Sequence, residues 1–362
     1  MRAIDILEKI EDNGFEAYIV GGYVRDHVLG YESNDIDICT NARVKDILNI
    51  FNDVNAYSDY YGNVKIITNK AVIDITTYRR DLRYNGDRKK VEIEYVDNLL
   101  DDIKRRDFTM NTLCMNKDGS IIDLMNGQDD IKNKVIRCVG SIEERITEDP
   151  LRMLRAVRFA TILGFKIDDE LYEELKNHKE LIEQLSMERI KEELTKILVS
   201  KNALVGLEIF RDLGYLPYLG IEYNRVVNVD DICGMYSQLE FSKDYPFTKE
   251  ERELIKNIKN ILSYGKIDKN ILFDYGLYVS IVAGSILGVD RETITSMDAK
   301  MEIKSTKDIR ITSEEICGVL GVEPSKIIRI VYDDLKNMIL NGRLENENNS
   351  IREYILDNRK KW

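Results

Sequence analysis

The sequence predicts an α+β protein, with a small α/β head followed by an all-α remainder. Two observations lead to this fold class. Short β-branched runs separated by Gly and Asn occur from about Tyr18 to Val139, and long amphipathic segments take their place after Glu143. A chain of 362 residues is also long enough for two or more domains. We therefore expect the head to end near residue 139.

The expected elements follow from the period of the apolar residues. In the head, we expect strands at Tyr18–Val20, Ile36–Cys39, Val64–Ile67, Val72–Ile75 and Val91–Tyr95, with helical segments at Val44–Phe51 and Thr109–Cys114. In the remainder, we expect helices at Leu151–Leu163, Leu171–Leu185, Arg189–Leu198 and Ser325–Asn341. All four prolines follow Gly140 and mark helix boundaries: Pro150, Pro217, Pro246 and Pro324.

Composition excludes several classes of protein. Hydrophobic residues make up 43% and charged residues 33%, which is typical of a folded, soluble chain. The longest nearly apolar stretch, Tyr278–Val289, falls short of the roughly 18 residues that a membrane span needs, so no membrane partner is expected. Five scattered cysteines without a CxxC pair favour the reducing cytoplasm. His27 and His178 are the only histidines, so the chemistry must rest on carboxylates and arginines.

The net charge of −12 does not exclude a nucleic-acid partner, because binding depends on a local basic surface. Between Arg79 and Lys90, six basic residues stand against two acidic ones. Such a run favours either nucleic-acid contact or a solvated loop.

An apolar strand runs into Gly21 and Gly22, where a helix is expected to begin. Glycines at this point let backbone N–H groups approach a triphosphate, and the helix N-terminus favours its charge. Arg25 lies one turn into the helix, within reach of phosphate. A plain turn is the alternative interpretation of the two glycines.

Asp35 and Asp37 alternate with isoleucines, so we expect both carboxylates on one face of a strand, roughly 6.5–7 Å apart at Cα. This spacing suits Mg²⁺ ions that activate a 3′-hydroxyl and neutralise the leaving pyrophosphate. A solvated strand face is the alternative, but the glycine pair just upstream favours the metal site. Asp74, on another expected strand, is either a third active-site carboxylate or an ordinary strand-end acid.

Two further motifs carry charged groups. In Lys104–Asn111, the arginines Arg105 and Arg106 precede Asp107, a combination that suits a triphosphate or ribose contact, with helix capping by Asp107 or Thr109 as the alternative. In Glu148–Phe159, Pro150 suits the first helical position, which makes Asp149 the expected N-cap.

Asp149 and Arg152 are three residues apart and so neighbours on one helix face. They offer an acceptor beside a donor, which complements the amino group and ring nitrogen of cytosine and adenine. Uracil and guanine present the opposite hydrogen-bonding polarity. Each polar group left without a hydrogen-bond partner would cost roughly 1–3 kcal/mol of binding free energy. A protein side-chain pair could thus replace a template. Each three-residue step turns the helix by about 300°, so Arg155 still flanks the pair while Arg158 lies nearly opposite and could serve phosphate, tRNA or an internal ion pair.

The ordered motifs resemble those of the class II CCA-adding tRNA nucleotidyltransferase and bacterial poly(A) polymerase family. They are Gly21–Asp26 with Asp35–Asp37, Arg105–Asn111, Glu148–Phe159 and Ser186–Leu194. The resemblance implies a polymerase-beta-like nucleotidyltransferase head over 1–139, a helical neck over 140–200 that selects the nucleobase, and a helical body and tail over 201–362 that bind the tRNA acceptor end.

The same resemblance implies Mg²⁺ as cofactor, held by the catalytic residues Asp35 and Asp37, with CTP and ATP as substrates. Nucleotide contacts would fall on Gly22, Arg25, Arg106, Asp107, Asp149, Arg152, Arg155 and Arg158. Tyr84–Val96 resembles the family's flexible loop and favours ATP use, although Gly86 and Lys90 depart from the usual acid and proline. The segment from Ile311 to Asn346 resembles the tail of CCA-adding enzymes, although Ser325 and Lys326 replace an expected Gly-Pro.

We therefore expect addition of C, C and A to the tRNA 3′ end without a nucleic-acid template. An enzyme adding only the terminal A, or a poly(A) polymerase, is the alternative within the family. A non-catalytic RNA-binding protein fits the intact acidic and basic motifs less well, and transfer to a small molecule leaves the large helical part unexplained. The sequence leaves the oligomeric state open.

Overall fold

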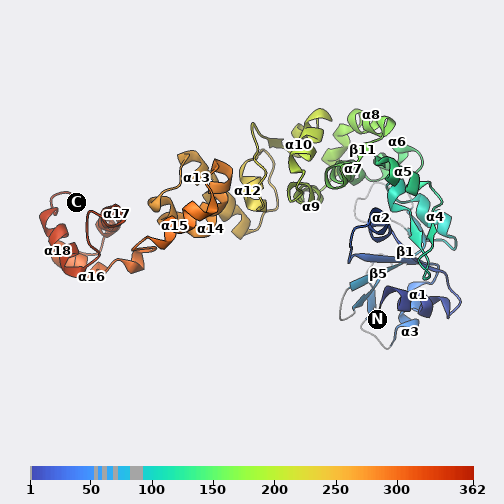
Figure 1. The fold of residues 1–362 in the computed structure, drawn as a ribbon, viewed down its shortest axis with the longest axis horizontal. Coiled ribbons are helices and arrows are strands. Elements are labelled where there is room, and N and C mark those ends of the chain that lie inside the picture. The colour runs from blue at the N-terminus through green and yellow to red at the C-terminus, as the bar shows by residue number, and fades with distance from the viewer. Residues whose placement is uncertain (1, 53–55, 59–62, 68–71, 82–92) are drawn as a thin grey trace. The chain divides into compact units, whose positions relative to one another are not determined.

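The computed structural model of the chain describes residues 2–52, 56–58, 63–67, 72–81 and 93–362. The chain forms two compact units, Met1–Gly220 and Ile221–Trp362. Figure 1 labels their elements in chain order. The α/β head and the helical remainder confirm the predicted α+β class.

A mixed sheet organises the start of the first unit. Among the described residues it has seven strands in the order β3-β4-β5-β2-β1-β8-β9. Their bounds are β1 (Ala17–Val20), β2 (Ile36–Thr40), β3 (Ala56–Ser58), β4 (Asn63–Ile67), β5 (Val72–Thr77), β8 (Cys114–Met115) and β9 (Ile121–Ile122). β2 and β5 are parallel, whereas β1 is antiparallel to both β2 and β8. A separate antiparallel pair joins β6 (Arg79–Asp81) to β7 (Ile93–Tyr95).

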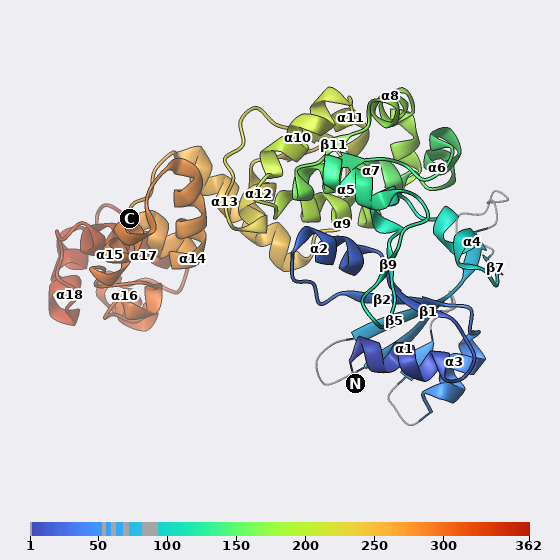
Figure 2. The ribbon, with the colours of Figure 1, turned by 45° about the vertical axis from the view of Figure 1, so that its right-hand side comes forward.

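Period-two alternation gives the central strands one apolar and one polar face. Val64, Ile38 and Ile75 are fully buried, whereas Asp37 and Asp74 occupy alternate positions of their strands and face the other way. The helices α1 (Ala3–Glu11) and α3 (Val44–Ile50) lie together on one side of the sheet, and α2 (Gly22–Leu29) lies on the other (Figure 2). The polar face is therefore the side on which a functional site can form.

The rest of the first unit is mostly helical. Its elements are α4 (Leu99–Lys104), η1 (Thr109–Asn111), α5 (Gly127–Asn133), β10 (Val135–Ile136), α6 (Ile142–Glu148), α7 (Leu151–Leu163), β11 (Lys166–Ile167), α8 (Asp169–Asn177), η2 (Lys179–Gln184), α9 (Met187–Leu198), α10 (Ala203–Asp212) and α11 (Leu216–Leu219). α7, α9 and α10 pack so closely that there is no room for a side chain at Gly206 of α10. A Cβ there would lie 2.5 Å from side-chain atoms of both Thr161 and Ile197.

Two expected helices are wrong in extent. Thr109–Cys114 is not one helical segment, because η1 ends at Asn111 and Cys114 begins β8. The turn is held instead by tertiary contacts: the Thr109 hydroxyl donates to the buried Asp130 carboxylate at 2.6 Å. Leu171–Leu185 divides into α8 and η2 at His178, where the backbone leaves helical geometry.

The second unit is helical apart from the antiparallel pair β12 (Ile221–Glu222) and β13 (Glu240–Phe241) in the described residues. Its helices are α12 (Ile232–Ser237), α13 (Lys249–Tyr264), α14 (Lys269–Leu287), α15 (Arg291–Ala299), η3 (Thr306–Asp308), α16 (Ser313–Leu320), α17 (Lys326–Leu340) and α18 (Asn348–Asp357). A large apolar core joins α14 to the helices that follow it, with Ile294, Val331 and Ile351 fully buried.

Among the described residues, α14 is the one helix whose length and hydropathy would let it cross a membrane. Gly276, with φ of 78°, interrupts its helical geometry. Leu272 and Ala283 are buried within the unit, and Leu277 and Ile281 pack against its apolar core. Core packing therefore accounts for its apolar composition.

Candidate active site

Asp37 lies within β2, whereas Asp35 directly precedes the strand, which begins at Ile36. The expectation that both carboxylates belong to the strand is therefore wrong for Asp35. In the sheet, Asp37 is opposite Val20 on one side and opposite Asp74 of β5 on the other. The register thus places Asp37 and Asp74 on adjacent strands.

Electrostatics distinguish these two neighbours. The pKa of Asp37 is raised to about 6, first by burial and then by repulsion from Asp35, with Asp74 adding to it and Arg106 opposing it. Asp74 is already compensated, because the Lys65 ammonium lies 3.1 Å from one carboxylate oxygen and 3.2 Å from the other. Asp74 therefore has the environment of a paired strand acid.

The residues present fit a divalent cation. Asp35 and Asp37 supply hard oxygen donors, and the pKa of Asp37 is raised first by burial and then by the charge of Asp35, both of which a bound cation would offset. Among the described residues, no group of three or more His, Cys, Asp or Glu side chains is arranged around a common metal position. One or two carboxylates together with substrate phosphates are a common ligand set for Mg²⁺.

Gly21 lies beside Asp37 at the entrance to α2. Its φ of 80° is a conformation that favours glycine. A Cβ at this position would lie 3.7 Å from Arg106 Nη1 and 3.8 Å from Asp37 Oδ2. Gly21 therefore marks where the Asp37 carboxylate and the Arg106 guanidinium approach the start of α2.

Arg25, one turn into α2, is largely buried and bonded on three of its nitrogens. Nε and Nη2 donate to Asp26 at 2.8 and 2.7 Å, and Nη1 donates to Asn111 Oδ1 at 2.8 Å. Gly22 lies directly against this guanidinium, because a Cβ there would be 3.6 Å from Nη2. The sequence predicted Arg25 as a phosphate contact but gave no indication of its partner Asn111.

The segment Arg105–Asp107 follows α4 and is anchored by a fully buried acid. Asp102 accepts from Arg105 at 2.9 Å, from Arg106 at 3.0 Å and from the backbone N–H of Arg79 at 3.2 Å. Burial would raise the pKa of Asp102, but Arg106 and Arg105 lower it, so the carboxylate stays ionised. Burial likewise would lower the pKa of Arg106, which Asp102 instead raises.

Asp107 connects this segment to α7. Its carboxylate accepts from Arg155 Nε at 2.7 Å and from Arg155 Nη2, and also from Asn111 Nδ2 at 3.0 Å. Burial would raise the pKa of Asp107, but Arg155 and Asn111 lower it. Asp107 is therefore an ionised group fixed between the head and α7.

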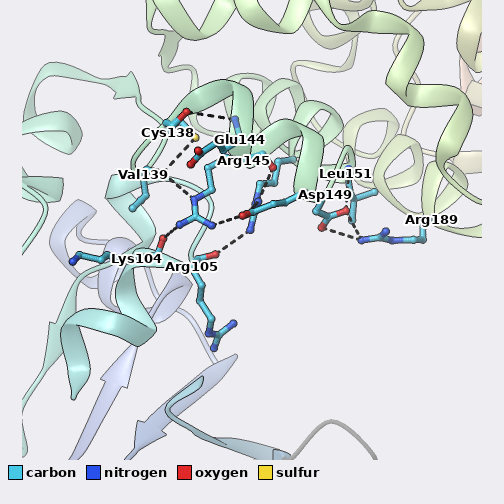
Figure 3. A network of polar contacts seen from close by, with 12 residues as sticks. Lys104, Arg105, Cys138, Val139, Glu144, Arg145, Asp149, Leu151 and Arg189 are labelled. Atoms are coloured by element: carbon cyan, nitrogen blue, oxygen red, sulfur yellow. Dashed lines mark hydrogen bonds and ion pairs between the residues drawn. The ribbon is translucent and has the colours of Figure 1, made fainter. Parts of the chain in front are cut away.

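The start of α7 differs by one residue from the expectation. Pro150 occupies the N-cap, not the first helical position, and Asp149 lies one residue earlier in an extended conformation. Asp149 Oδ1 still accepts from the backbone N–H of Leu151 at 3.2 Å, so its capping chemistry is retained. Arg189 of α9 donates from Nη2 to both oxygens of Asp149, at 3.0 and 3.1 Å (Figure 3).

Arg152 is held by backbone carbonyls. Nη1 donates to the carbonyl of Arg145 at 2.6 Å, and Nη2 donates to that of Arg105 at 3.0 Å. Arg145 in turn donates to the carbonyls of Val139 and Lys104, and to Glu148 at 2.6 Å (Figure 3). This network ties the start of α7 to the Arg105–Asp107 segment.

Arg158 forms an internal ion pair, one of the three roles that the sequence left open. Its Nη1 lies 3.1 Å from Glu193 Oε1, and both side chains are buried. Burial and the neighbouring Arg155 lower the pKa of Arg158. The Phe159 ring approaches three guanidinium groups: those of Arg25, Arg155 and Arg158 lie 5.1, 5.4 and 4.3 Å from its centroid.

Sequence reasoning missed four residues that hold these groups: Asp102, Asn111, Arg189 and Glu193. A signal for two of them was present, because Arg189 and Glu193 are four residues apart on one face of α9. The basic run between Arg79 and Lys90 and the loop residues Gly86 and Lys90 lie largely or wholly outside the described residues.

Models of three protein families match successive parts of the chain. The "Poly A polymerase head domain" matches residues 17–137, and the "Probable RNA and SrmB- binding site of polymerase A" matches residues 164–223. The tRNA nucleotidyltransferase domain 2 matches residues 238–355.

Similarity to curated proteins extends over the whole length. The CCA-adding enzyme of Ligilactobacillus salivarius (strain UCC118) is 33% identical, with 99% of this chain and 96% of that protein covered. The CCA-adding enzyme of Staphylococcus aureus (strain Newman) is 30% identical, with 98% and 97% covered.

Solved structures share the fold. A Bacillus stearothermophilus CCA-adding enzyme in complex with CTP superposes with a TM-score of 0.85 at 24% identity, over 99% of this chain and 97% of that one. A Thermotoga maritima CCA-adding enzyme complexed with tRNA gives a TM-score of 0.72 at 21% identity, over 98% and 94%. With relatives at 30% identity or more along nearly its entire length, the chain belongs to the CCA-adding enzyme family of nucleotidyltransferases.

Proposed function

We propose that this chain adds C, C and A to the 3′ end of tRNA, using CTP and ATP and releasing pyrophosphate. One observation carries the proposal: Arg105–Asp107 joins the carboxylate site to the start of α7, where the proposed base-selecting residues Asp149 and Arg152 lie. Arg106 lies near Asp37, Arg105 accepts from Arg152 through its carbonyl, and Asp107 is paired with Arg155.

Asp35 and Asp37 would hold Mg²⁺ at the tRNA 3′ terminus. When bound, Mg²⁺ lowers the pKa of the attacking hydroxyl and neutralises charge on the triphosphate. The two carboxylates would be its protein ligands, while Arg106, held in place by its buried partner Asp102, offsets part of the repulsion around Asp37. Asp74 is left to its ion pair with Lys65.

Gly22, Arg25 and the α2 N-terminus would receive the triphosphate. Backbone N–H groups at a helix start favour phosphate, and Arg25 adds a charged donor nearby. Asp107 would accept a hydrogen bond from a ribose hydroxyl. An ionised carboxylate is a hydrogen-bond acceptor, and its negative charge repels phosphate. Arg155 and Arg158 would stabilise this surface through Asp107 and Glu193.

Asp149 and Arg152 would select the base. An acceptor beside a donor complements cytosine and adenine and opposes uracil and guanine. Arg189 holds the Asp149 carboxylate, and two carbonyls hold Arg152, so both side chains are oriented by the protein. Fixed partners of this kind favour selectivity because little reorganisation is needed on binding.

We further infer that residues 140–200 contribute base selection and residues 201–362 bind the tRNA acceptor end. All five cysteines are free thiols, which supports a cytoplasmic location.

The test uses three tRNA primers: one lacking the CCA end, one ending in C and one ending in CC. Each is incubated with CTP, ATP or both, and the products are sequenced. Completion of CCA on all three supports the proposal. Addition of A to the CC primer alone would indicate an A-adding enzyme, long A tails would indicate poly(A) synthesis, and no extension would indicate a non-catalytic binder.

A further inference from the structure

The side chain of Asn111 lies between two charged residues from different parts of the site. Its Oδ1 accepts from Arg25 Nη1 at 2.8 Å, and its Nδ2 donates to Asp107 Oδ1 at 3.0 Å. An arginine can only donate and an ionised carboxylate can only accept, so the residue between them must do both, which an amide can do and an ionised carboxylate cannot. Asn111 is 7% exposed, so water cannot readily replace either bond.

Each charged neighbour has a second anchor. Arg25 is bonded to Asp26 at 2.7 Å, and Asp107 is bonded to Arg155 at 2.7 Å. Asn111 therefore closes a continuous chain of hydrogen bonds from α2 to α7. The Phe159 ring of α7 adds a further contact between the two halves, because the guanidinium groups of Arg25 and Arg155 both approach it.

The turn that carries Asn111 is built from other bonds. The Thr109 hydroxyl donates to Asp130 at 2.6 Å, and the Thr112 hydroxyl donates to the Thr109 carbonyl at 2.6 Å. A Cβ at Gly127 would lie 2.3 Å from that same carbonyl, so α5 packs directly against the turn. The position of the Asn111 backbone is thus fixed independently of its side-chain amide.

We propose that Asn111 is a positioning residue that sets the spacing between Arg25 and Asp107, and thereby the preference for ribonucleotides over 2′-deoxyribonucleotides. This role rests on the proposed function, in which Arg25 contacts the triphosphate and Asp107 accepts from a ribose hydroxyl. Fixing both groups through one amide lets phosphate binding align the sugar hydroxyl with its acceptor. A change in Asn111 therefore alters nucleotide affinity and sugar discrimination together, while the metal-site carboxylates stay in place.

The experiment compares Asn111→Leu, Asn111→Asp and the control Thr112→Val. Leucine removes both bonds, whereas ionised aspartate keeps the acceptor for Arg25, loses the donor to Asp107 and places a like charge beside it. Thr112 is as buried as Asn111 and belongs to the same turn, but its hydroxyl contacts neither Arg25 nor Asp107. kcat and KM are measured for CTP and 2′-deoxy-CTP on a tRNA lacking its CCA end, with thermal unfolding of each variant alongside.

We expect Asn111→Leu to raise the KM for CTP about tenfold or more, with kcat changed by less than about threefold. Both Asn111 variants should reduce the kcat/KM preference for CTP over 2′-deoxy-CTP at least about fivefold. Thr112→Val should keep the wild-type preference. The near-isosteric Asn111→Asp provides the result if the leucine variant does not fold.

An unchanged sugar preference in Asn111→Asp overturns the proposal, as does an equal loss in Thr112→Val, which would reduce Asn111 to a structural role. A fall in kcat alone, with KM and sugar preference unchanged, also overturns it. Wild-type extension of the primer reports separately on the proposed function. An active wild type with indifferent Asn111 variants therefore refutes the role of Asn111 and leaves CCA addition standing.

Discussion

The Asp107 carboxylate and the Arg155 guanidinium form a partly buried ion pair between residues 48 positions apart, with Nε 2.7 Å from Oδ2. Through this pair, the Arg105–Asp107 segment is attached to α7, the helix that carries Arg152. Several expected results follow from this connection and from its neighbours.

Replacing Asp37 with asparagine should abolish nucleotide addition. The amide cannot supply the charge that holds a divalent cation, and we expect a loss on the order of 10³-fold or more in kcat. tRNA binding, measured by gel shift, should change by less than about twofold because Asp37 lies in the head. Asp12→Asn, an exposed acid at the end of α1, is the control. Normal turnover in Asp37→Asn would refute the metal assignment.

The same carboxylate should make the metal-free protein less stable at high pH. The folded pKa of Asp37 is about 6, above its ordinary value of 3.8, so the folded state binds the proton more tightly. The loss of folding stability caused by the ionised Asp37 is therefore complete above pH 6 and disappears as the pH falls from 6 to below 4. Asp37→Asn should raise stability at pH 8 by up to about 3 kcal/mol and match the wild type near pH 4.

Thermal unfolding in EDTA across pH 4–8 measures this difference. A stability gap between Asp37→Asn and the wild type that does not vary with pH would contradict the assigned environment. Added Mg²⁺ should close the gap at pH 8, because the cation compensates the carboxylate in the wild type alone.

Asp149→Asn should relax base selection. An amide in place of the carboxylate can present a donor to uracil, so the kcat/KM preference for CTP over UTP should fall by about 10–100-fold. Steady-state addition to a tRNA lacking its CCA end measures this ratio. Arg189→Ala should reduce the preference for CTP over UTP by less, since it frees the Asp149 carboxylate without changing its hydrogen-bonding polarity. Unchanged selectivity in Asp149→Asn would exclude the template role.

Glu193→Ala should destabilise the first unit strongly. It leaves the buried Arg158 without its 3.1 Å partner, and breaking such a pair typically costs about 3–5 kcal/mol. The neighbouring Glu192, exposed and paired with Lys196 on the helix surface, is a matched control whose alanine variant should lose less than about 0.5 kcal/mol. Urea unfolding of both variants checks this, and similar losses would show that the buried pair contributes no more than the surface pair.

Local patterns in the sequence predicted the strands at Val72 and Ile36 and the helix Leu151–Leu163, because alternation and helical period are short-range signals. They could not predict that Arg189 would bond to Asp149 across 40 residues. The helix expected at Thr109 failed for a related reason. Asp130 and Gly127, distant in sequence, impose a tight turn there against the local helical preference.

The three guanidinium groups around Phe159 also bear on how the protein responds to salt. Each of the three already has a carboxylate partner within the protein, in Asp26, Asp107 and Glu193, and Phe159 itself is only 7% exposed. Counterions screen charges at the surface far more than charges in the interior. Raising the ionic strength should therefore lower the affinity for a long polyanion, which binds across the surface, much more than the affinity for a single mononucleotide.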